Sequence, residues 1–447
     1  MTDLLSIGAS GARAYQSALA TTSDNIANAA TVGYSRRVAT VREVVATGGN
    51  TSAINSGLGA NVGGVTRSAD AFRATEVRTA SSDLARTLAG AAWLGRIDSG
   101  LTQNKLGDQL TSFFTSAKAV AADPTALPAR ATMLENAAGV AAAFGATGKA
   151  LDGAMIDLKA SADTAVTQLN NLSASLAKVN AGLARANDGT AGQAALLDQR
   201  DQMLEQMSAL TDVTVSFDAY GRATVQAGNS SGPTLVEGAQ AAIVSQVSND
   251  EGTFSFSVKQ ASGAMQTMAP NGGALAGIAE SGSRIAAARD QIGQMAQSFA
   301  EGVNAVQAAG ADLQGNAGEP IFSVGDPAYN LSVVMADPRG IAAAAASGGT
   351  RDNSNLAGFD TLRTSGNYEQ QVTDLTAANG AALSGRNSVA DAQTSIRDSA
   401  VSARDSVSGV NIDEEAVDLM RFQQAYQAST RVIQVARETL QSILDIR

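Results

Sequence analysis

The chain of 447 residues contains no histidine and no cysteine. The absence of histidine excludes Ser-His-Asp and Cys-His nucleophile systems, and the absence of cysteine excludes disulfides, CxxC redox motifs and the common zinc sites. No stretch supplies the run of about 18 apolar residues that a membrane span requires, so no membrane insertion is expected. The N-terminus carries Asp3 and lacks a long apolar run, which argues against a cleaved Sec signal peptide.

Aromatic residues are also scarce, at 4% of a chain that is 44% hydrophobic. Most of the apolar surface therefore comes from alanine, valine and leucine, which suit long, closely packed helices. The net charge is 31 − 42 = −11, which argues against nucleic acid as a partner because phosphate contacts need a basic face. The adjacent Arg36 and Arg37 are interpreted as solvated surface.

The last forty residues have the pattern of one long helix. Asn411 is a suitable N-cap, Glu414 stands at the capping-box position three residues later, and acidic residues follow the cap. No proline or glycine interrupts the sequence after Asn411. A heptad pattern of large side chains follows, which predicts a helix that needs a partner helix. Its positions are Ile412, Leu419, Tyr426, Ile433 and Leu440.

The other end of the chain carries a matching pattern. Residues at intervals of seven, within an expected helix over residues 4–30, are Leu5, Ala12, Leu19 and Ile26. Two heptad segments can pair as a coiled coil that brings the chain ends together, with everything between them inserted. The alternative for each is an ordinary amphipathic helix packed on its own domain.

Between the ends, helical patterns alternate with one β-rich stretch. Helix is expected from an N-cap at Ser68, with interruptions near Asp123–Pro124 and at Pro128, and alternation around a Tyr220-Gly221 turn predicts strands. The sequence therefore predicts an elongated, mostly α fold with an inserted small β-rich domain. The expected domains are a terminal coiled coil (1–33 and 410–447), a mostly helical middle domain (34–210 and 274–409) with an extended loop near 40–66, and a β-rich outer domain (211–273).

No constellation with catalytic chemistry is apparent. Asp198, Asp201 and Glu205 have helical spacing with Arg200 among them, and are interpreted as a solvated helix face rather than a glycosidase pair. No metal or cofactor site and no enzymatic activity are expected.

The two terminal stretches resemble the bacterial flagellar axial proteins, which comprise rod, hook and hook-associated families. The N-terminal similarity runs from Ala18 to Arg37 and includes the shared elements Asn25, Asn28, Gly33 and Tyr34. The C-terminal similarity covers residues 408–447, with VNIDEE and RFQQAYQASTRVI as its most specific parts. Within this group, GYSRR, LLDQRDQ, GEPIFSVG and SGVNIDEE, in that order, are similar to the hook–filament junction family.

The resemblance implies a structural subunit that assembles as a helical layer and adapts hook to filament. It implies the hook protein and the second hook–filament junction protein as partners, and an export chaperone at the C-terminal helix. It also implies secretion by the flagellar type III apparatus. The alternatives are another axial protein, such as a hook or distal rod subunit, or a carboxylate-pair glycan hydrolase carried on an axial stalk.

Overall fold

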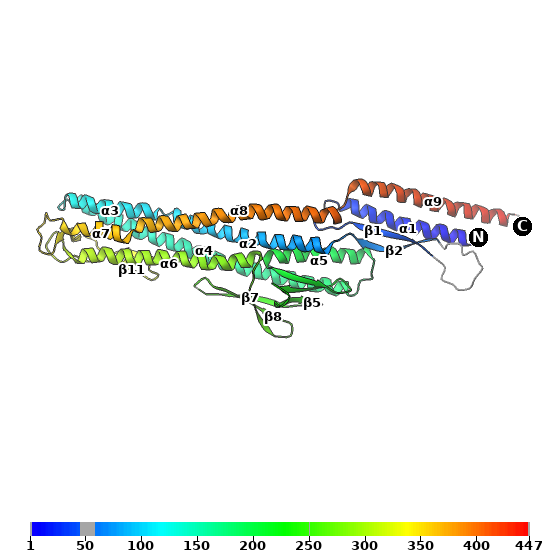
Figure 1. Cartoon of the computed structure of the whole chain (residues 1–447), viewed down its shortest axis with the longest axis horizontal. Helices are drawn as coiled ribbons and strands as arrows, with labels where there is room; N and C mark the ends of the chain where they lie inside the picture. Colours follow the sequence, from blue (N-terminus) through cyan, green and yellow to red (C-terminus); the bar gives the residue numbers. More distant parts are fainter. Residues whose placement is uncertain (1, 45–58, 250, 446–447) are drawn as a thin grey trace.

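A computed structural model describes residues 2–44, 59–249 and 251–445 of the chain. The molecule is elongated, its helices run along the long axis, and both chain ends lie at the same tip (Figure 1). The prediction of a mostly helical, elongated chain with small antiparallel sheets and paired terminal helices is confirmed.

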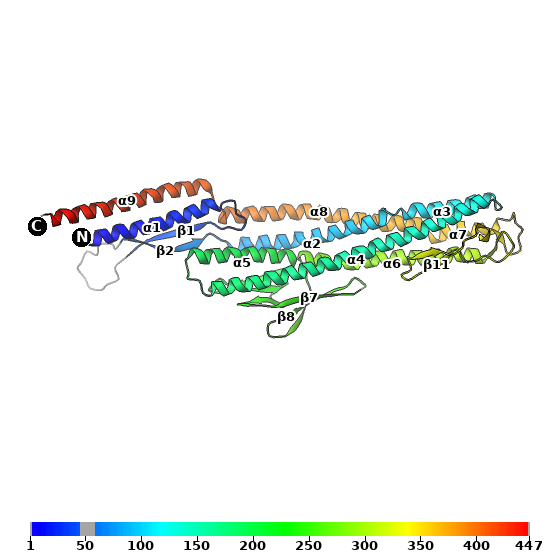
Figure 2. The same cartoon turned by 180° about the vertical axis from the view of Figure 1, so that it is seen from behind.

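The end that holds the termini is built from two helices and a strand pair. Helix α1 (Thr2–Ala27) lies beside α9 (Ile412–Leu444) in both Figure 1 and Figure 2. Strands β1 (Arg37–Glu43) and β2 (Ala60–Arg67) pair antiparallel and pack against α1. Most of the described residues of the expected loop near 40–66 belong to this strand pair, and its residues 45–58 lie outside the described part of the chain. We call α1, β1, β2 and α9 the terminal unit.

The remaining helices form a long bundle, the rod. They are α2 (Ala71–Thr102), α3 (Leu106–Ala122), α4 (Leu127–Leu183), α5 (Ala191–Leu210), α6 (Gly273–Ala308), α7 (Ala357–Gly366) and α8 (Tyr368–Ser408). Phe113 and Phe299 meet edge to face at 5.4 Å in its apolar core. Among the described residues, that core takes no side chain from the terminal unit. The two parts are therefore held together by something other than a shared hydrophobic core.

Three helix boundaries differ from the sequence prediction. Helix α2 is capped by Asp70, whose carboxylate accepts from the N–H groups of Phe72 and Arg73, so Ser68 is not the N-cap. Pro128 does not interrupt a helix, because it lies in the first turn of α4, where no intrahelical N–H bond is lost. An unpredicted break separates α2 from α3, where Lys105 adopts a left-handed conformation with φ +46°.

Two small antiparallel sheets lie on the side of the rod. One contains β3 (Val213–Phe217), β4 (Ala223–Ala227), β5 (Thr234–Glu237) and β6 (Gln240–Ala241), and the other β7 (Ile243–Ser248), β8 (Phe254–Lys259) and β9 (Met265–Met268). The predicted turn joins β3 to β4, where Gly221 supplies φ +75°. Asn170 on α4 docks the second sheet, since its amide donates to the Val244 C=O and accepts from the Val244 N–H, each at 2.8 Å.

Short elements near the far tip complete the fold. They are β10 (Gly310–Ala311), β11 (Phe322–Val324), β12 (Leu331–Val333), η1 (Pro338–Gly340), β13 (Ala344–Ala345) and η2 (Ser354–Leu356). Arg130, only 1% exposed, lies beneath them and donates to the carbonyls of Pro124 and Ile341 at 2.6 Å each. Its guanidinium thus fixes the crossing of several chain segments at this tip.

Candidate functional site

The junction between the terminal unit and the rod gathers most of the residues that the sequence motifs singled out. Asn25, 1% exposed near the end of α1, is its centre. Its amide Nδ2 donates to the Arg37 C=O at 2.7 Å and to Glu415 Oε2 at 2.9 Å. Its Oδ1 accepts from the Arg37 N–H at 2.9 Å and from the Tyr34 hydroxyl at 2.8 Å. One amide therefore ties α1, β1 and α9 together.

The turn between α1 and β1 supplies the other motif residues. Gly33 has φ +80°, a conformation that favours glycine and lets the chain reverse. Tyr34 then returns to Asn25, and burial raises the pKa of its hydroxyl to about 12. Asn28 stays within the turn, where its amide donates to the Asp24 C=O at 2.9 Å.

The start of α9 is anchored to this turn by charge. Asn411 precedes α9 and its Oδ1 accepts from the Asp413 N–H at 3.1 Å, while Glu414 contacts the Asn411 side chain rather than its backbone N–H. Glu415, 2% exposed, accepts from Arg36 Nε at 2.6 Å. This hydrogen bond raises the pKa of Arg36, so the arginine stays charged.

A second set of ion pairs joins the terminal unit to α5 of the rod. Asp198 Oδ2 lies 3.0 Å from Arg37 Nη2, and Asp198 Oδ1 lies 2.8 Å from Arg67 Nε without hydrogen-bond alignment. Arg67 also binds Asp201, which accepts from Arg200 as well. Burial raises the pKa of Asp198 despite its two arginine neighbours.

These contacts correct two interpretations made from the sequence. Asp198 and Asp201 are not part of a solvated helix face, since they are 12% and 23% exposed and bound by arginines, whereas Glu205 is 40% exposed and pairs with Arg404. Arg36 and Arg37 are likewise not simply solvated surface. Arg67 was missed altogether, and Arg200 was named only as a neighbour of the carboxylates on a solvated helix face. One sequence signal could have found them. Acidic residues lie on one segment and basic residues on another, and the pairing of the two chain ends must bring these segments together.

Close approach of α1 and α9 depends on small residues. A Cβ on Gly8 would lie 2.7 Å from the Ile433 side chain, and a Cβ on Gly11 would lie 2.8 Å from Ser429 Oγ. The predicted seam residues Leu5, Ala12, Leu19 and Ile26 are half-buried. The most buried line of α1 is rotated away from them, because α1 is covered by α9 on one side and by β1–β2 on another. It consists of Gly8, Gly11, Ala14, Ala18, Thr21, Thr22 and Asn25.

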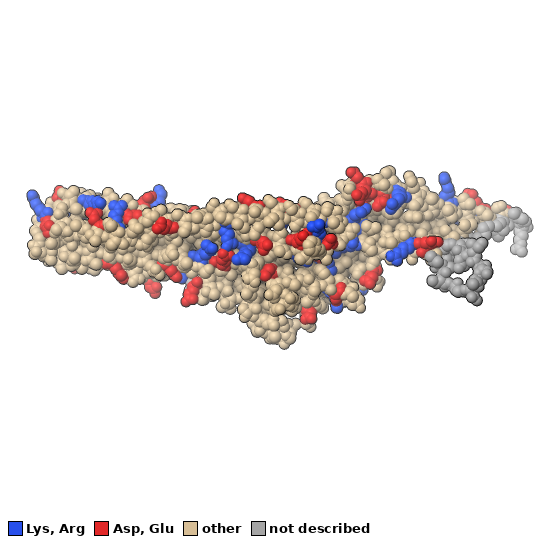
Figure 3. Space-filling view, in the orientation of Figure 1, with Lys and Arg blue, Asp and Glu red and all other residues tan. Residues whose placement is uncertain are grey.

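The predicted seam residues of α9 differ in burial according to their position along the helix. Leu419, Tyr426 and Ile433 are half-buried on the side turned to α1, whereas Ile412 and Leu440 at the ends are 57% and 39% exposed. A different line of apolar residues faces away from α1. We call it the outward stripe of α9, formed by Val417, Met420 and Val435. Figure 3 shows charged side chains scattered singly and in small groups over the face of the molecule that it draws.

Within the described ranges, no group of three or more acidic residues is arranged to hold a metal ion. The same ranges contain no helix with the length and apolarity needed to cross a membrane. The junction itself connects two helical parts through buried polar and charged side chains, and we call it the joint.

Comparison with known proteins agrees with a structural role. Family models for the flagella basal body rod protein and for the C-terminal part of the flagellar basal body rod FlgEFG proteins match residues 5–34 and 402–446. The model for the flagellar hook-associated protein FlgK helical domain matches residues 94–322, more than half of the chain. The chain belongs to this FlgK family of flagellar hook-associated proteins. The family resemblance inferred from the sequence motifs is thereby confirmed.

Individual relatives extend the match. Flagellar hook-associated protein 1 of Salmonella typhimurium is 30% identical over 73% of this chain and 60% of its own length. The Bacillus subtilis protein of that name is 24% identical over 97% of this chain and 96% of its own. The match thus spans about 60% of the Salmonella relative. The flagellar hook junction protein FlgK from Burkholderia pseudomallei shares the fold, with a TM-score of 0.64 at 16% identity over 74% of this chain and 100% of that one.

Proposed function

We propose that the chain is a structural subunit of the bacterial flagellum that assembles at the hook–filament junction and adapts hook to filament. The family assignment and the names of the relatives support this proposal. In this proposal the protein is not an enzyme and works by occupying a position in a helical layer of identical subunits.

The outward stripe of α9 is the observation that carries the proposal. Val417, Met420 and Val435 are 60%, 56% and 55% exposed, at spacings that place them on one helix face. Such a line of exposed apolar side chains marks an interaction surface in a soluble protein. A neighbouring copy of the terminal unit, with its own long helix, is the partner that this narrow stripe suits.

The other proposed partners are those that contact a subunit in this layer. The hook protein lies on one side of the layer and the second hook–filament junction protein on the other. Before assembly the subunit leaves the cell through the flagellar type III apparatus. An export chaperone covers the α9 stripe until secretion, because the stripe would otherwise promote premature association.

The alternatives fit the described residues less well. A hook or distal rod subunit would share the ends of the chain, but the helical-domain match over residues 94–322 favours a hook-associated protein. A glycan hydrolase needs two carboxyl groups free to act on a substrate. Asp198 and Asp201 are instead held by arginines at the joint.

Complementation of cells that lack this protein tests the proposal. We expect Met420→Asp with Val435→Asp to be made and secreted, but to leave filaments unattached and filament subunits in the medium. Gln423→Asp with Gln434→Asp adds the same charge at exposed positions of α9 outside the stripe and should support normal filaments. Normal filaments with the stripe variant, or equal failure with both variants, would count against the proposal.

A further inference from the structure

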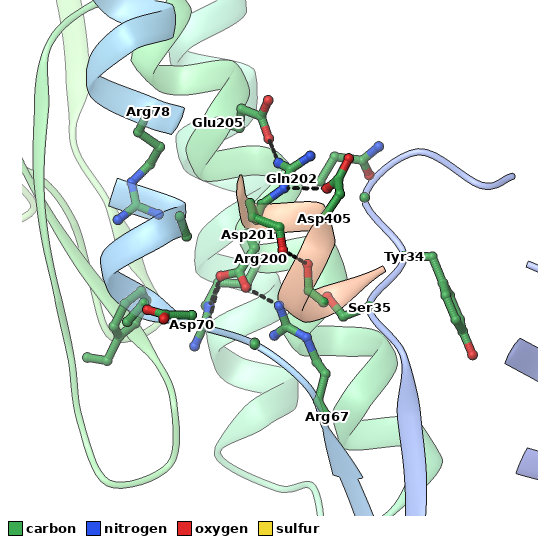
Figure 4. A pocket seen from close by; sticks show the side chains of 17 residues that line it. Tyr34, Ser35, Arg67, Asp70, Arg78, Arg200, Asp201, Gln202, Glu205 and Asp405 are labelled. Carbon is green, nitrogen blue, oxygen red and sulfur yellow. Dashed lines mark hydrogen bonds and ion pairs between the residues drawn. The ribbon is translucent and has the colours of Figure 1, made fainter. Parts of the chain in front are cut away.

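A cavity of about 260 Å³ lies where the terminal unit meets the rod. Its walls come from the turn after α1, the end of β2, the start of α2, α5, and the end of α8, with Phe217 of β3 at one side. Figure 4 shows the charged side chains that these elements direct towards it. A volume of this size is below that of pockets for drug-sized ligands and suits a small ion with its water.

Every carboxylate in the cavity wall already has a partner. Asp201 binds Arg67 and Arg200, and both Glu205 and Asp405 bind Arg404, at 3.0 and 2.9 Å. The fourth, Asp70, caps α2 by accepting from two backbone N–H groups.

Arg78 of α2 is the basic residue of the wall that lacks such a partner. Its side chain is 93% buried, since only 7% is exposed, and its one described hydrogen bond is from Nη2 to Thr75 Oγ1 at 2.7 Å. Among the described residues, no carboxylate lies within ion-pair distance of it. Burial lowers the pKa of Arg78, although the nearby charges of Asp201 and Glu205 oppose this shift.

The remaining N–H groups of Arg78 are accessible from the cavity. Arg78 lines the cavity, and none of its nitrogens is among the described buried polar atoms that lack a partner. In Figure 4 its guanidinium points from α2 in the direction of Asp70. A planar guanidinium with several free donors matches two oxygens of a carboxylate, phosphate or sulfate group.

We propose that this cavity is a binding site for a small oxyanion, held by the Arg78 guanidinium between the terminal unit and the rod. A cation is disfavoured because the four carboxylates of the wall are already bound by arginines or by backbone N–H groups. The bound oxyanion completes the charge pairing of the joint. It therefore favours the arrangement in which α2, α5 and the turn after α1 enclose the cavity.

Titration of the full-length monomer tests the site. Sodium sulfate or phosphate is added to the protein, and sodium chloride at matched ionic strength serves as the reference. Binding is followed by calorimetry and by the midpoint of thermal unfolding. We expect saturable binding to the wild type and a loss of affinity of about tenfold or more in Arg78→Gln. Arg73→Gln removes an exposed arginine of the same helix, paired with Glu76, and should bind like the wild type.

A second variant covers the case in which Arg78→Gln fails to fold. Arg78→Lys keeps the charge but not the planar fork, and should weaken binding while preserving the circular dichroism spectrum. Absence of saturable binding to the wild type would overturn the proposal, as would equal binding by Arg78→Lys, Arg73→Gln and the wild type. Because the readout is anion binding by a monomer, neither result depends on flagellar assembly.

Discussion

Replacement of Asn25 by alanine should selectively loosen the joint at the end of α1. The amide makes four hydrogen bonds, and two of them satisfy the N–H and C=O groups of Arg37. Alanine leaves both backbone groups and one oxygen of the buried Glu415 without this partner. The rod should be unaffected, because its core contains no described residue of the terminal unit.

The magnitude follows from the number of groups left unpaired. A buried polar group that loses its partner costs about 1–3 kcal/mol. The Arg37 groups are only partly buried, so water can replace some of the lost bonds. We therefore expect a loss of about 2–4 kcal/mol in the local opening free energy, which corresponds to roughly 30- to 700-fold more frequent opening.

Hydrogen exchange read by mass spectrometry measures this opening segment by segment. Peptides from the end of α1, β1 and the start of α9 should lose protection in Asn25→Ala, whereas peptides around Trp93 in the rod should not. Asn28→Ala is the matched control, because Asn28 bonds only within its own turn. Unchanged protection in Asn25→Ala, or the same loss in both variants, would refute the role assigned to Asn25.

Three further predictions concern packing, the far tip and pH. Gly8→Ala should destabilise the terminal unit by about 1–3 kcal/mol because its Cβ meets Ile433 at 2.7 Å, whereas Gly95→Ala, with nothing within 4 Å, should be neutral or stabilising; thermal unfolding compares them. Arg130→Met should reduce the free energy of unfolding by about 2–4 kcal/mol, since it leaves several carbonyls unpaired. Urea unfolding followed by the fluorescence of Trp93 in the rod should show this as a lower midpoint. Because the pKa of Tyr34 is raised to about 12, its contribution to stability is complete below pH about 10 and is lost as pH rises through 12; Tyr34→Phe should reduce that alkaline loss in melts at increasing pH.

Periodicity predicted the helices well and the joint poorly. The terminal heptads and the cap at Asn411 indicated two long helices that pair, because helix signals are local in sequence. The face by which α1 pairs was not predictable in the same way. A heptad count favours large residues, whereas α1 is covered on two sides and uses Gly8 and Gly11 for close approach.

The buried charges show a second limit of sequence reasoning. Asp198 and Arg37 are separated by 161 positions, and each in isolation has the pattern of a solvated charge. Only the fold brings them together and removes them from water. The motif residues Asn25 and Tyr34 were identified through the family resemblance, but their shared hydrogen bond followed from the structure alone.

The most direct test of the proposed function is the accessibility of the outward stripe of α9 in assembled flagella. The chain has no cysteine, so Met420→Cys would carry a single thiol, at a position 56% exposed in the monomer. We expect a maleimide dye to label this thiol rapidly in the secreted monomer and slowly in isolated hook–filament junctions. Equal labelling rates in the two states would show that the stripe is not an assembly interface, and would contradict the proposed function.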